Sequence, residues 1–300
     1  MSRTAADLVA ILELEKIEED IFRGYSPASG WKRTFGGQVI AQALMAATRT
    51  VEGRAAHSLH GYFILPGDPE APIIFEVDRI RDGGSFTTRR VVAVQHGKAI
   101  FSLSASFHAA EQGFDHFIPA PEAPDPETLP DVAQLMQSAG RTAEQIQRYV
   151  DRISPVELRP ISPLHRAPVS ATELREPKQS QWIRVAGRLP DDPIIHRAAL
   201  AFLSDMTLLG ASVVAHGRSL AEPEIQAASL DHALWLHRPF RADEWLLYVQ
   251  DSPSASGARG FNRGLLYSRD RILVASVAQE GLIRRRTRPE KVPGRDASSA

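Results

Sequence analysis

Residues 229–240 read SLDHALWLHRPF and place groups that could do chemistry among the apolar residues of a strand. A serine, an aspartate, two histidines and an arginine alternate with leucines and a tryptophan, and a proline ends the run, as it would end a β ladder. Because side chains alternate between the faces of a strand, Ser229 and Asp231 are expected on one face and His232 on the other. Both faces carry polar as well as apolar side chains, so the stretch fits either a strand with one solvent-exposed face or a strand that lines a functional site.

Two further polar residues stand in apolar surroundings. Asp205 lies in LSDMTLLG, inside a stretch at 198–215 that we expect to be helical, and Gln279 lies in VASVAQEG, which we expect to be a strand. A buried carboxylate is costly unless it is hydrogen-bonded, and burial raises its pKa toward the range useful for a general base. Each residue also has an ordinary structural explanation: Asp205 as a cap of backbone groups, Ser229 as a strand-end serine, and Gln279 as part of a bulge.

The elements that would carry these residues occur twice. A glycine pair opens an alanine-rich helix at 35–47, and β-branched runs broken at hairpin signals follow it. The second half repeats this order, with the helical stretch at 198–215 followed by strands. The shared order of elements indicates a duplication. An offset of 173 residues aligns Gly84 with Gly257, Arg90 with Arg263, Lys98 with Arg271 and Ser106 with Gln279.

A helix followed by an antiparallel sheet, present twice, indicates an α+β fold in which each sheet wraps round one long central helix. Each copy leaves one sheet edge open, and joining the two sheets edge to edge would remove an aggregation hazard. Five prolines between residues 119 and 130 exclude regular structure there, and short helices are expected after them. We expect a first unit at 1–111, a proline-rich linker at 112–180, a second unit with the candidate residues Asp205, Ser229 and Gln279 at 181–288 and a disordered tail at 289–300.

The composition is that of a soluble globular protein, with 43% hydrophobic and 24% charged residues. The net charge of −1 gives no general attraction to nucleic acid or to an anionic membrane. The chain has no cysteine, which excludes disulfides, thiolate metal sites and a cysteine nucleophile. The amphipathic N-terminus has no signal-peptide pattern and the C-terminal SSA is no peroxisomal address. No apolar run approaches the roughly 18 residues of a membrane span, so we expect a cytoplasmic protein.

Seven long motifs follow one another in unbroken order across roughly residues 6 to 286. They are LELEKIEEDIFRG, FGGQVIAQAL, HSLHGYFILPGDPEAPIIFEV, RDGGSFTTRRV, SLDHALWLHRPF, EWLLYVQDSPSASGARGFNRG and VASVAQEGLIR. Together they resemble the acyl-CoA thioesterase II family. The resemblance implies a duplicated (double) hotdog fold, with both units in one chain. It also implies hydrolysis of medium- and long-chain fatty acyl-CoA to free fatty acid and CoA, without metal or cofactor, by a homo-oligomer such as a dimer or tetramer.

In that family an aspartate, a threonine or serine, and a glutamine hold the water that attacks the thioester carbonyl. The resemblance carries these catalytic roles to Asp205, Ser229 and Gln279. Serine departs from the common threonine, because it keeps the hydroxyl but lacks the methyl that restricts the rotamer. The first copy has Ser106 where the second has Gln279, so one working site per chain is implied. A thiolate is a good leaving group, and the site therefore needs little acid help.

The phosphates of CoA would require local arginines in a nearly neutral protein. Arg259 and Gly257 lie in SGARGFNRG and are candidate substrate contacts, and His57 is a third candidate. Arg263 has a counterpart in the first copy, which indicates a structural pair, and the RRRTR run after the last strand is expected to be a solvated tail. His57 and His60 fall on opposite faces of a strand, so we expect no metal site between them.

Two other functions stay open from the sequence alone. Related folds host acyl-CoA hydratases or dehydratases, which pair an aspartate with a histidine on the helix that faces the substrate, and LSDMTLLG contains no histidine. A non-catalytic acyl-CoA-binding protein would hold the thioester and leave it intact. Release of free thiol from a saturated acyl-CoA separates hydrolysis from both. Asp231 and His232 are candidates for supporting the site, or ordinary members of a paired strand.

Overall fold

The computed structural model describes residues 4–27, 33–161 and 176–286. The strands of the first half are β1 Glu15–Glu18, β2 Ile21–Gly24, β3 Ala55–Phe63, β4 Ile73–Asp82, β5 Phe86–Gln95 and β6 Lys98–His108. The strands of the second half are β7 Val156–Pro160, β8 Lys178–Val185, β9 Ile225–Ser229, β10 Asp231–Leu236, β11 Leu246–Ser256, β12 Arg259–Tyr267 and β13 Leu273–Arg285.

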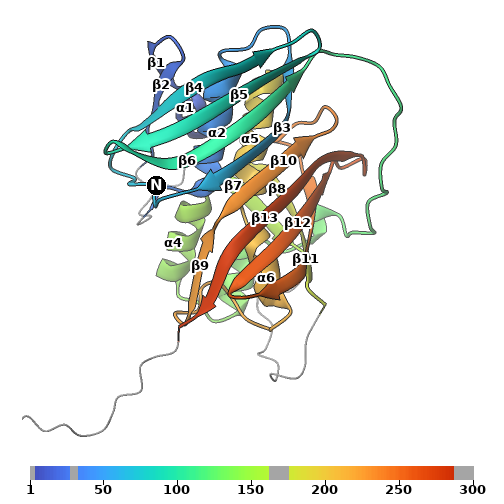
Figure 1. Ribbon diagram of the computed structural model, residues 1–300. Helices are drawn as coiled ribbons and strands as arrows, with labels where there is room; N and C mark the ends of the chain where they lie inside the picture. The colour runs from blue at the N-terminus through green and yellow to red at the C-terminus, as the bar shows by residue number, and fades with distance from the viewer. Residues whose placement is uncertain (1–3, 28–32, 162–175, 287–300) are drawn as a thin grey trace, which may run out of the picture.

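All of these strands belong to one antiparallel sheet, in the order β1-β2-β4-β5-β6-β3-β10-β13-β12-β11-β8-β7, with β9 paired to β13 (Figure 1). The two halves meet where β3 pairs with β10, with Leu59 opposite Leu234. The predicted joining of two sheets edge to edge is therefore confirmed. The repeat also extends to side chains, because the cross-strand pair Asp78 and Arg90 recurs, at the same offset, as Asp251 and Arg263.

The helices are α1 Ala5–Leu12, α2 Gly36–Thr48, α3 Val132–Ser138, α4 Ala143–Ile153, α5 Pro193–Ser204 and α6 Ala211–Val214, with short 3-10 turns at Pro126–Thr128 (η1) and Leu208–Gly210 (η2). α2 and α5 pack against each other behind the sheet (Figure 1). Both helices are apolar on nearly all sides, as expected of helices enclosed by a sheet. Alanine and glycine keep them thin, so the backbones approach closely: a Cβ on Gly37 would lie 2.5 Å from the carbonyl oxygen of Phe202.

The second central helix is interrupted, which the sequence did not predict. A continuous helix was expected over 198–215, but α5 ends at Ser204 and Asp205 is its C-cap. Thr207 follows in the left-handed conformation, with φ of 84°. Gln179 Nε2 donates to the Thr207 carbonyl at 2.9 Å and Gln250 Nε2 donates to its hydroxyl at 2.9 Å, so neighbouring strands hold the break in place. Asp205 consequently lies at a helix end and not within a helix.

The stretch Pro193–Val214 is long and apolar enough to cross a membrane by length and composition alone, with a mean hydropathy of 1.4. This differs from the expectation that no apolar run approaches that length. However, 67% of the 18-residue window that meets this criterion is buried inside the protein, because the stretch is the helical layer behind the second half of the sheet. A buried core helix passes the same test as a membrane span, so the composition carries no argument for a membrane.

The segment between the halves runs along one side of the protein before it packs on the second half (Figure 1). The proline-rich part has a single 3-10 turn, η1, and otherwise irregular backbone up to Pro130, close to what the prolines predict. Trp182 Nε1 donates to the Pro124 carbonyl at 2.8 Å, and Arg269 binds Asp125 at 2.9 Å. α3 and α4 follow, as the predicted short helices, but β7 was not predicted and adds a strand to the second half. The exact unit boundaries stay a prediction, and the tail predicted at 289–300 lies outside the described residues.

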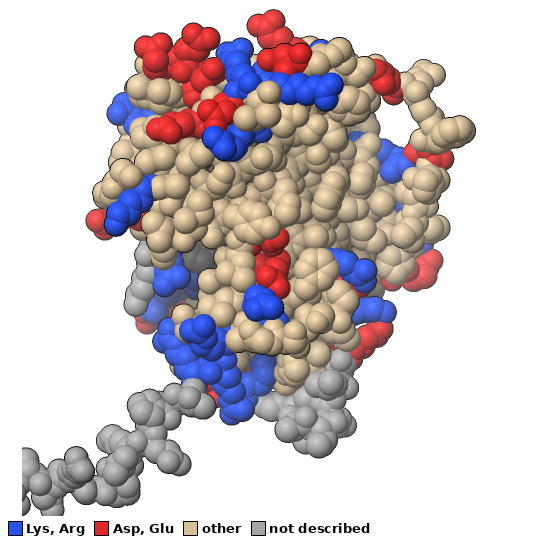
Figure 2. Space-filling model, in the orientation of Figure 1, with Lys and Arg blue, Asp and Glu red and all other residues tan. Residues whose placement is uncertain are grey.

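The outer face of the sheet, on the side away from α2 and α5, carries few charged side chains in its middle (Figure 2). Serine, threonine, tyrosine and histidine side chains of β3, β5 and β6 contribute to it. Charged residues gather toward the two ends of this face (Figure 2). Asp205, Gln279 and His232, the buried polar residues of the candidate site, lie on the opposite, inner face, between sheet and helices.

Candidate active site

Asp205 lies where the end of α5 meets the beginning of α2. Its side chain is 6% exposed. The backbone N–H of Gly37 hydrogen-bonds to the carboxylate, and a Cβ on Gly36 would lie 2.7 Å from Asp205 Oδ2. Gly36 of the first half therefore leaves the space that the carboxylate of the second half occupies, and Gly37 supplies a backbone N–H to it. The partial positive charge at the start of α2 also suits an anionic group at this point.

The acidity of Asp205 matches a group that must exchange a proton near neutral pH. Burial raises the pKa of its carboxyl from 3.8 to about 6, because the charged form is poorly solvated there. The hydrogen bonds from Gln279 and from the Gly37 backbone act in the opposite direction and keep the pKa from rising further. At pH 7 most molecules carry Asp205 as a carboxylate, which is the form a general base requires.

Gln279 faces Asp205 from β13. Its Nε2 donates to Asp205 Oδ1 at 2.6 Å, so the structure brings together two of the three residues expected to hold a water. Its Oε1 is buried, and within the described ranges it accepts no hydrogen bond. A buried acceptor without a donor is costly, and such an atom commonly marks the place of a water or a ligand.

Ser229 ends β9 and lies opposite Gly281 of β13. A Cβ on Gly281 would point at Leu209, which follows α5, so this position faces the interior. Gln279 is two residues away on the same strand and shares that face. Ser229 therefore lies on the inner face, opposite Gly281, which is the next inner-face position of β13 after Gln279. Within the described part of the chain, no side-chain hydrogen bond joins Ser229 to Asp205 or Gln279.

The stretch expected as one strand is two strands, with a bulge at Leu230. The backbone N–H of Leu230 donates to the Glu280 carbonyl at 2.9 Å, and that of Glu280 donates to Asp231 Oδ1 at 2.6 Å. The extra residue changes the alternation, so Ser229 shares the inner face with His232 and not with Asp231. The expectation from strict period-two alternation was therefore wrong for this pair.

His232 is fully buried beside the site. Its Nδ1 lies 3.2 Å from Gln279 Nε2 and 3.9 Å from Asp205 Oδ1, and its Nε2 lies 2.8 Å from Ser204 Oγ. Burial lowers the pKa of His232 to about 3, with a further contribution from His60, so the ring is neutral and forms no ion pair with Asp205. Ser204 and the Gly37 N–H were not predicted as parts of the site. The position of Ser204 directly before Asp205 was the only signal for it in the sequence.

The candidate substrate contacts lie apart from these residues. Gly257 and Ala258 form the turn of the β11–β12 hairpin, with φ of 55° and 60°, a conformation that favours glycine. Arg259 is exposed and pairs with Glu280 at 3.0 Å, on the opposite face of the sheet from Gln279. His57 lies on β3 with its Nε2 2.8 Å from Ser106 Oγ. The structure does not bring any of the three next to Asp205.

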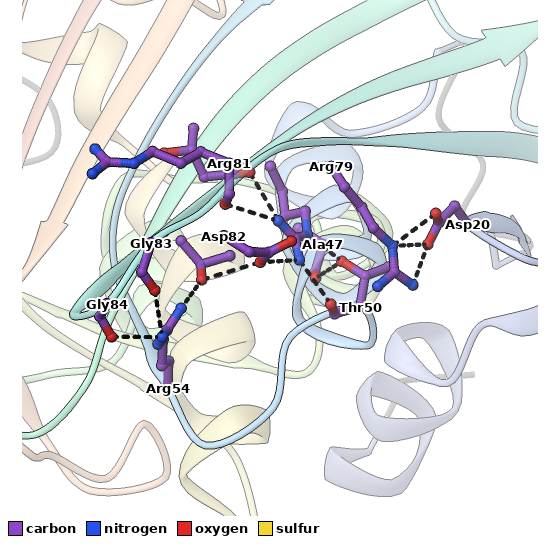
Figure 3. Close-up of polar contacts among 12 residues, drawn as sticks. Asp20, Ala47, Thr50, Arg54, Arg79, Arg81, Asp82, Gly83 and Gly84 are labelled. Carbon is purple, nitrogen blue, oxygen red and sulfur yellow. Dashed lines mark hydrogen bonds and ion pairs between the residues drawn. The ribbon is translucent and has the colours of Figure 1, made fainter.

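A second polar cluster lies at the other end of α2 (Figure 3). Arg79 binds Asp20 through three hydrogen bonds, and the buried Arg89 donates to Thr50 and Asp82 at 2.9 and 2.7 Å. A cavity of about 540 Å³ adjoins it, lined by Lys16, Glu18, Glu19, Asp20, Phe22, Arg49, Thr50 and Arg79. None of the catalytic candidates lines this cavity. Arginine at the end of a helix stabilises its carbonyl groups, so we assign the cluster a structural role.

Comparison with known proteins identifies the class to which this fold and site belong. The sequence-family model of the acyl-CoA thioesterase N-terminal domain matches residues 26–108, and the family model of acyl-CoA thioesterase matches residues 164–282. A structure with the hotdog fold from Alicyclobacillus acidocaldarius superimposes with a TM-score of 0.73 at 19% identity, covering 94% of this chain and 99% of the other. The duplicated sheet and its paired central helices are thus a double hotdog fold.

Closer relatives define the family. Human acyl-coenzyme A thioesterase 8 is 40% identical over 287 residues, which cover 92% of this chain and 88% of the relative. The crystal structure of an acyl-CoA thioesterase II from Mycobacterium marinum is 44% identical, with a TM-score of 0.76, and covers 93% of this chain and 99% of the other. The chain belongs to the acyl-CoA thioesterase II family, as the motifs indicated, and is a thioester hydrolase.

Proposed function

We propose that this thioesterase hydrolyses medium- or long-chain fatty acyl-CoA to free fatty acid and CoA by direct attack of a water held by Asp205, Ser229 and Gln279. One observation carries the proposal: a carboxylate with a pKa raised to about 6 lies 2.6 Å from an amide whose oxygen is buried and has no donor among the residues that the structure describes. A water between them could donate one hydrogen to Asp205 and the other to Gln279 Oε1.

The reaction follows from these groups. Asp205 removes a proton as the water oxygen forms a bond to the thioester carbonyl carbon. The resulting tetrahedral intermediate collapses, the carbon–sulfur bond breaks, and CoA leaves as a thiolate that takes up a proton from Asp205 or from solvent. A thiol has a pKa of about 8.5, so the leaving group requires little assistance. Ser229, on the inner face beside Gln279, would orient the water or the carbonyl through its hydroxyl.

The hydratase alternative receives little support from the contacts of His232, the histidine that the described residues place near Asp205. His232 does approach Asp205, whereas the histidine on α5, His196, lies near the other end of that helix and accepts a hydrogen bond from the Ala242 N–H. Both ring nitrogens of His232, however, already face protein groups, and burial lowers its pKa to about 3. A histidine in this state is a poor base for abstracting a proton from a substrate. Hydrolysis requires only the carboxylate and a water, and it is the reaction we favour.

The test is release of free thiol from a series of saturated acyl-CoA substrates of increasing chain length, followed with a thiol-reactive dye. The protein has no cysteine and adds no thiol background. Wild type should release thiol, Asp205→Asn should lose nearly all turnover, and Gln279→Ala should lose much of it. Asp251→Asn is a matched control, because its exposed partner Arg263 lies away from the site. Binding of acyl-CoA without any thiol release would instead support the non-catalytic binder.

A further inference from the structure

The oxygen and the NH2 group of the Gln279 side-chain amide are nearly equal in shape but opposite in hydrogen bonding. One end accepts hydrogen bonds and the other donates them. If the oxygen faced Asp205, the amide would offer N–H groups to the water site, where an attacking water needs acceptors for its hydrogens. The orientation of this amide therefore decides whether the site can activate a water.

The orientation of the Gln279 amide follows from the hydrogen bonds of Ser204, at the end of α5. Ser204 Oγ lies 2.9 Å from the Ala201 carbonyl oxygen, which can only accept, and 2.8 Å from His232 Nε2. A hydroxyl has one hydrogen, and the carbonyl takes it. Ser204 Oγ must then accept from His232, so the proton of the neutral imidazole is on Nε2.

With its proton on Nε2, His232 presents a bare Nδ1 to Gln279. Nδ1 lies 3.2 Å from Gln279 Nε2 and accepts one of its two hydrogens, while Asp205 Oδ1 accepts the other at 2.6 Å. Both hydrogens of the amide are thereby used inside the protein. The oxygen Oε1 is left pointing away from both partners, buried and without a donor among the described residues.

The reverse arrangement is unfavourable at both ends of this chain of contacts. It would require Ser204 to donate to His232, which leaves the Ala201 carbonyl without that hydrogen. It would also place the Gln279 oxygen against the ionised Asp205 at the 2.6 Å now spanned by a hydrogen bond. Two acceptors at that distance repel each other, so the ionised site admits one arrangement only.

We propose that His232, held in its Nε2–H tautomer by Ser204, is a positioning residue that fixes the Gln279 amide with its oxygen toward the attacking water. This inference rests on the proposed function of Asp205 and Gln279. His232 touches neither water nor substrate in this role, because both of its nitrogens face protein groups. Its effect on the reaction passes through Gln279, which distinguishes it from the catalytic histidine of a hydratase.

The inference also links His232 to the acidity of Asp205. The polar groups around that carboxylate are Gln279 from β13, the Gly37 N–H from α2 and, at 3.9 Å, His232 from β10. Tyr248 of β11 donates to the Ser204 carbonyl at 2.6 Å and lies beyond them. Without His232, the Gln279 amide is free to rotate and its donation to Asp205 weakens. Loss of a donor to a carboxylate raises its pKa.

The first experiment compares His232→Phe, His232→Asn and Ser204→Ala with wild type. His232→Phe keeps a ring of similar size and removes both nitrogens, and we expect kcat to fall by about 10-fold or more while KM changes by less than about threefold. The acid limb of the kcat profile should move to higher pH. His232→Asn retains an acceptor near the Nδ1 position and should recover part of the lost kcat. Ser204→Ala should resemble His232→Phe in direction, whereas Ser252→Ala, another buried serine of the same half, should keep wild-type kcat.

The second experiment reads the tautomer directly by NMR of ring-¹⁵N-labelled histidine at pH 7. The His232 signals are assigned as those missing from His232→Phe or, if that variant does not fold, as those displaced in Ser204→Ala. A proton on Nε2 is the expected result. A proton on Nδ1, or a charged ring, would overturn the inference.

The proposed function of Asp205 and the positioning role of His232 can fail separately. Normal turnover in folded Asp205→Asn would remove the proposed function, and the positioning role with it. Loss of turnover in Asp205→Asn together with wild-type kcat and an unshifted acid limb in both folded His232→Phe and Ser204→Ala would remove the positioning role alone.

Discussion

Asp231 accepts the backbone N–H of Glu280 at 2.6 Å, so a carboxylate occupies the place of a backbone carbonyl where β9 gives way to β10. Its second oxygen lies 3.2 Å from His60 Nε2 on β3, in the other half of the protein. One side chain thus supports the bulge that turns Ser229 inward and also bridges the seam between the halves.

Removing this support should weaken both stability and turnover. We expect Asp231→Ala to lower the free energy of unfolding by about 1–3 kcal/mol, because the partly buried N–H of Glu280 loses its acceptor. The kcat should fall as well, since Ser229 is no longer held at the bulge. Asp231→Asn keeps an oxygen for the N–H and should be milder in both respects. Urea unfolding and steady-state kinetics measure the two effects, and equal stabilities of the Ala variant and wild type would show that the contact is dispensable.

The pH dependence of turnover should report the acidity of Asp205. With a pKa near 6, the Asp205 carboxylate, which is the proposed base, is lost as the pH falls below that value. We expect kcat to decline about tenfold per pH unit on the acid side of the profile. A limb centred near pH 4 would mean that Asp205 is less buried in the working enzyme or that another group limits the rate.

Asp205 should make the free energy of unfolding decrease as the pH rises, which is opposite to the usual effect of an aspartate. Its pKa is higher in the folded state than the 3.8 of the exposed group, so folding is favoured by protonation and disfavoured as pH rises from about 4 to 6. The corresponding cost above pH 6 is about 3 kcal/mol. We therefore expect Asp205→Asn, measured against wild type, to become relatively more stable at pH 8 than at pH 4. A constant difference across this range in urea unfolding would contradict the raised pKa.

Ser229 can be tested with two substitutions. Ser229→Ala removes the hydroxyl and should reduce kcat by about 10-fold or more if that group orients the water. Ser229→Thr keeps the hydroxyl and adds a methyl that restricts its rotamer, so turnover should be equal to wild type or a few-fold higher. Thiol-release kinetics measure both, and an alanine variant as active as wild type would limit the water site to Asp205 and Gln279.

Gly36 offers a test of the contact between the halves. A Cβ there would lie 2.7 Å from Asp205 Oδ2 and 2.9 Å from Phe63, so Gly36→Ala should displace the carboxylate and lower kcat by about 10-fold or more. Gly84→Ala is the matched control, because a Cβ at Gly84 meets nothing within 4 Å. Equal activity of the two variants would show that the site adapts to the added methyl group.

The duplication and the joined sheet could be predicted because they follow from regular features. Alternating apolar residues, hairpin signals and one constant offset indicate strands and their order, and the offset even aligns the Asp78–Arg90 pair with Asp251–Arg263. The proximity of Asp205 and Gln279 was also expected, although only the resemblance assigned them roles. Cytoplasmic location, oligomeric state and chain-length preference stay predictions.

The breaks in regularity could not be predicted from the sequence. The end of α5 at Ser204 depends on Gln179 and Gln250, which reach Thr207 from strands distant in the chain. The bulge at Leu230 depends on a hydrogen bond between Asp231 and Glu280. Such tertiary contacts override local propensity, and both lie beside the candidate site.

The position of Asp205 against Gly36 and Gly37 has a consequence for how the two copies have diverged. The first copy lacks the proposed catalytic residues, yet its glycine backbone forms the surface on which the Asp205 carboxylate lies. An isolated second copy would possess Asp205, Ser229 and Gln279 and still lack that surface. Selection on the first copy should therefore act on the absence of side chains at Gly36 and Gly37, and the proposed site of the second copy has come to depend on the first.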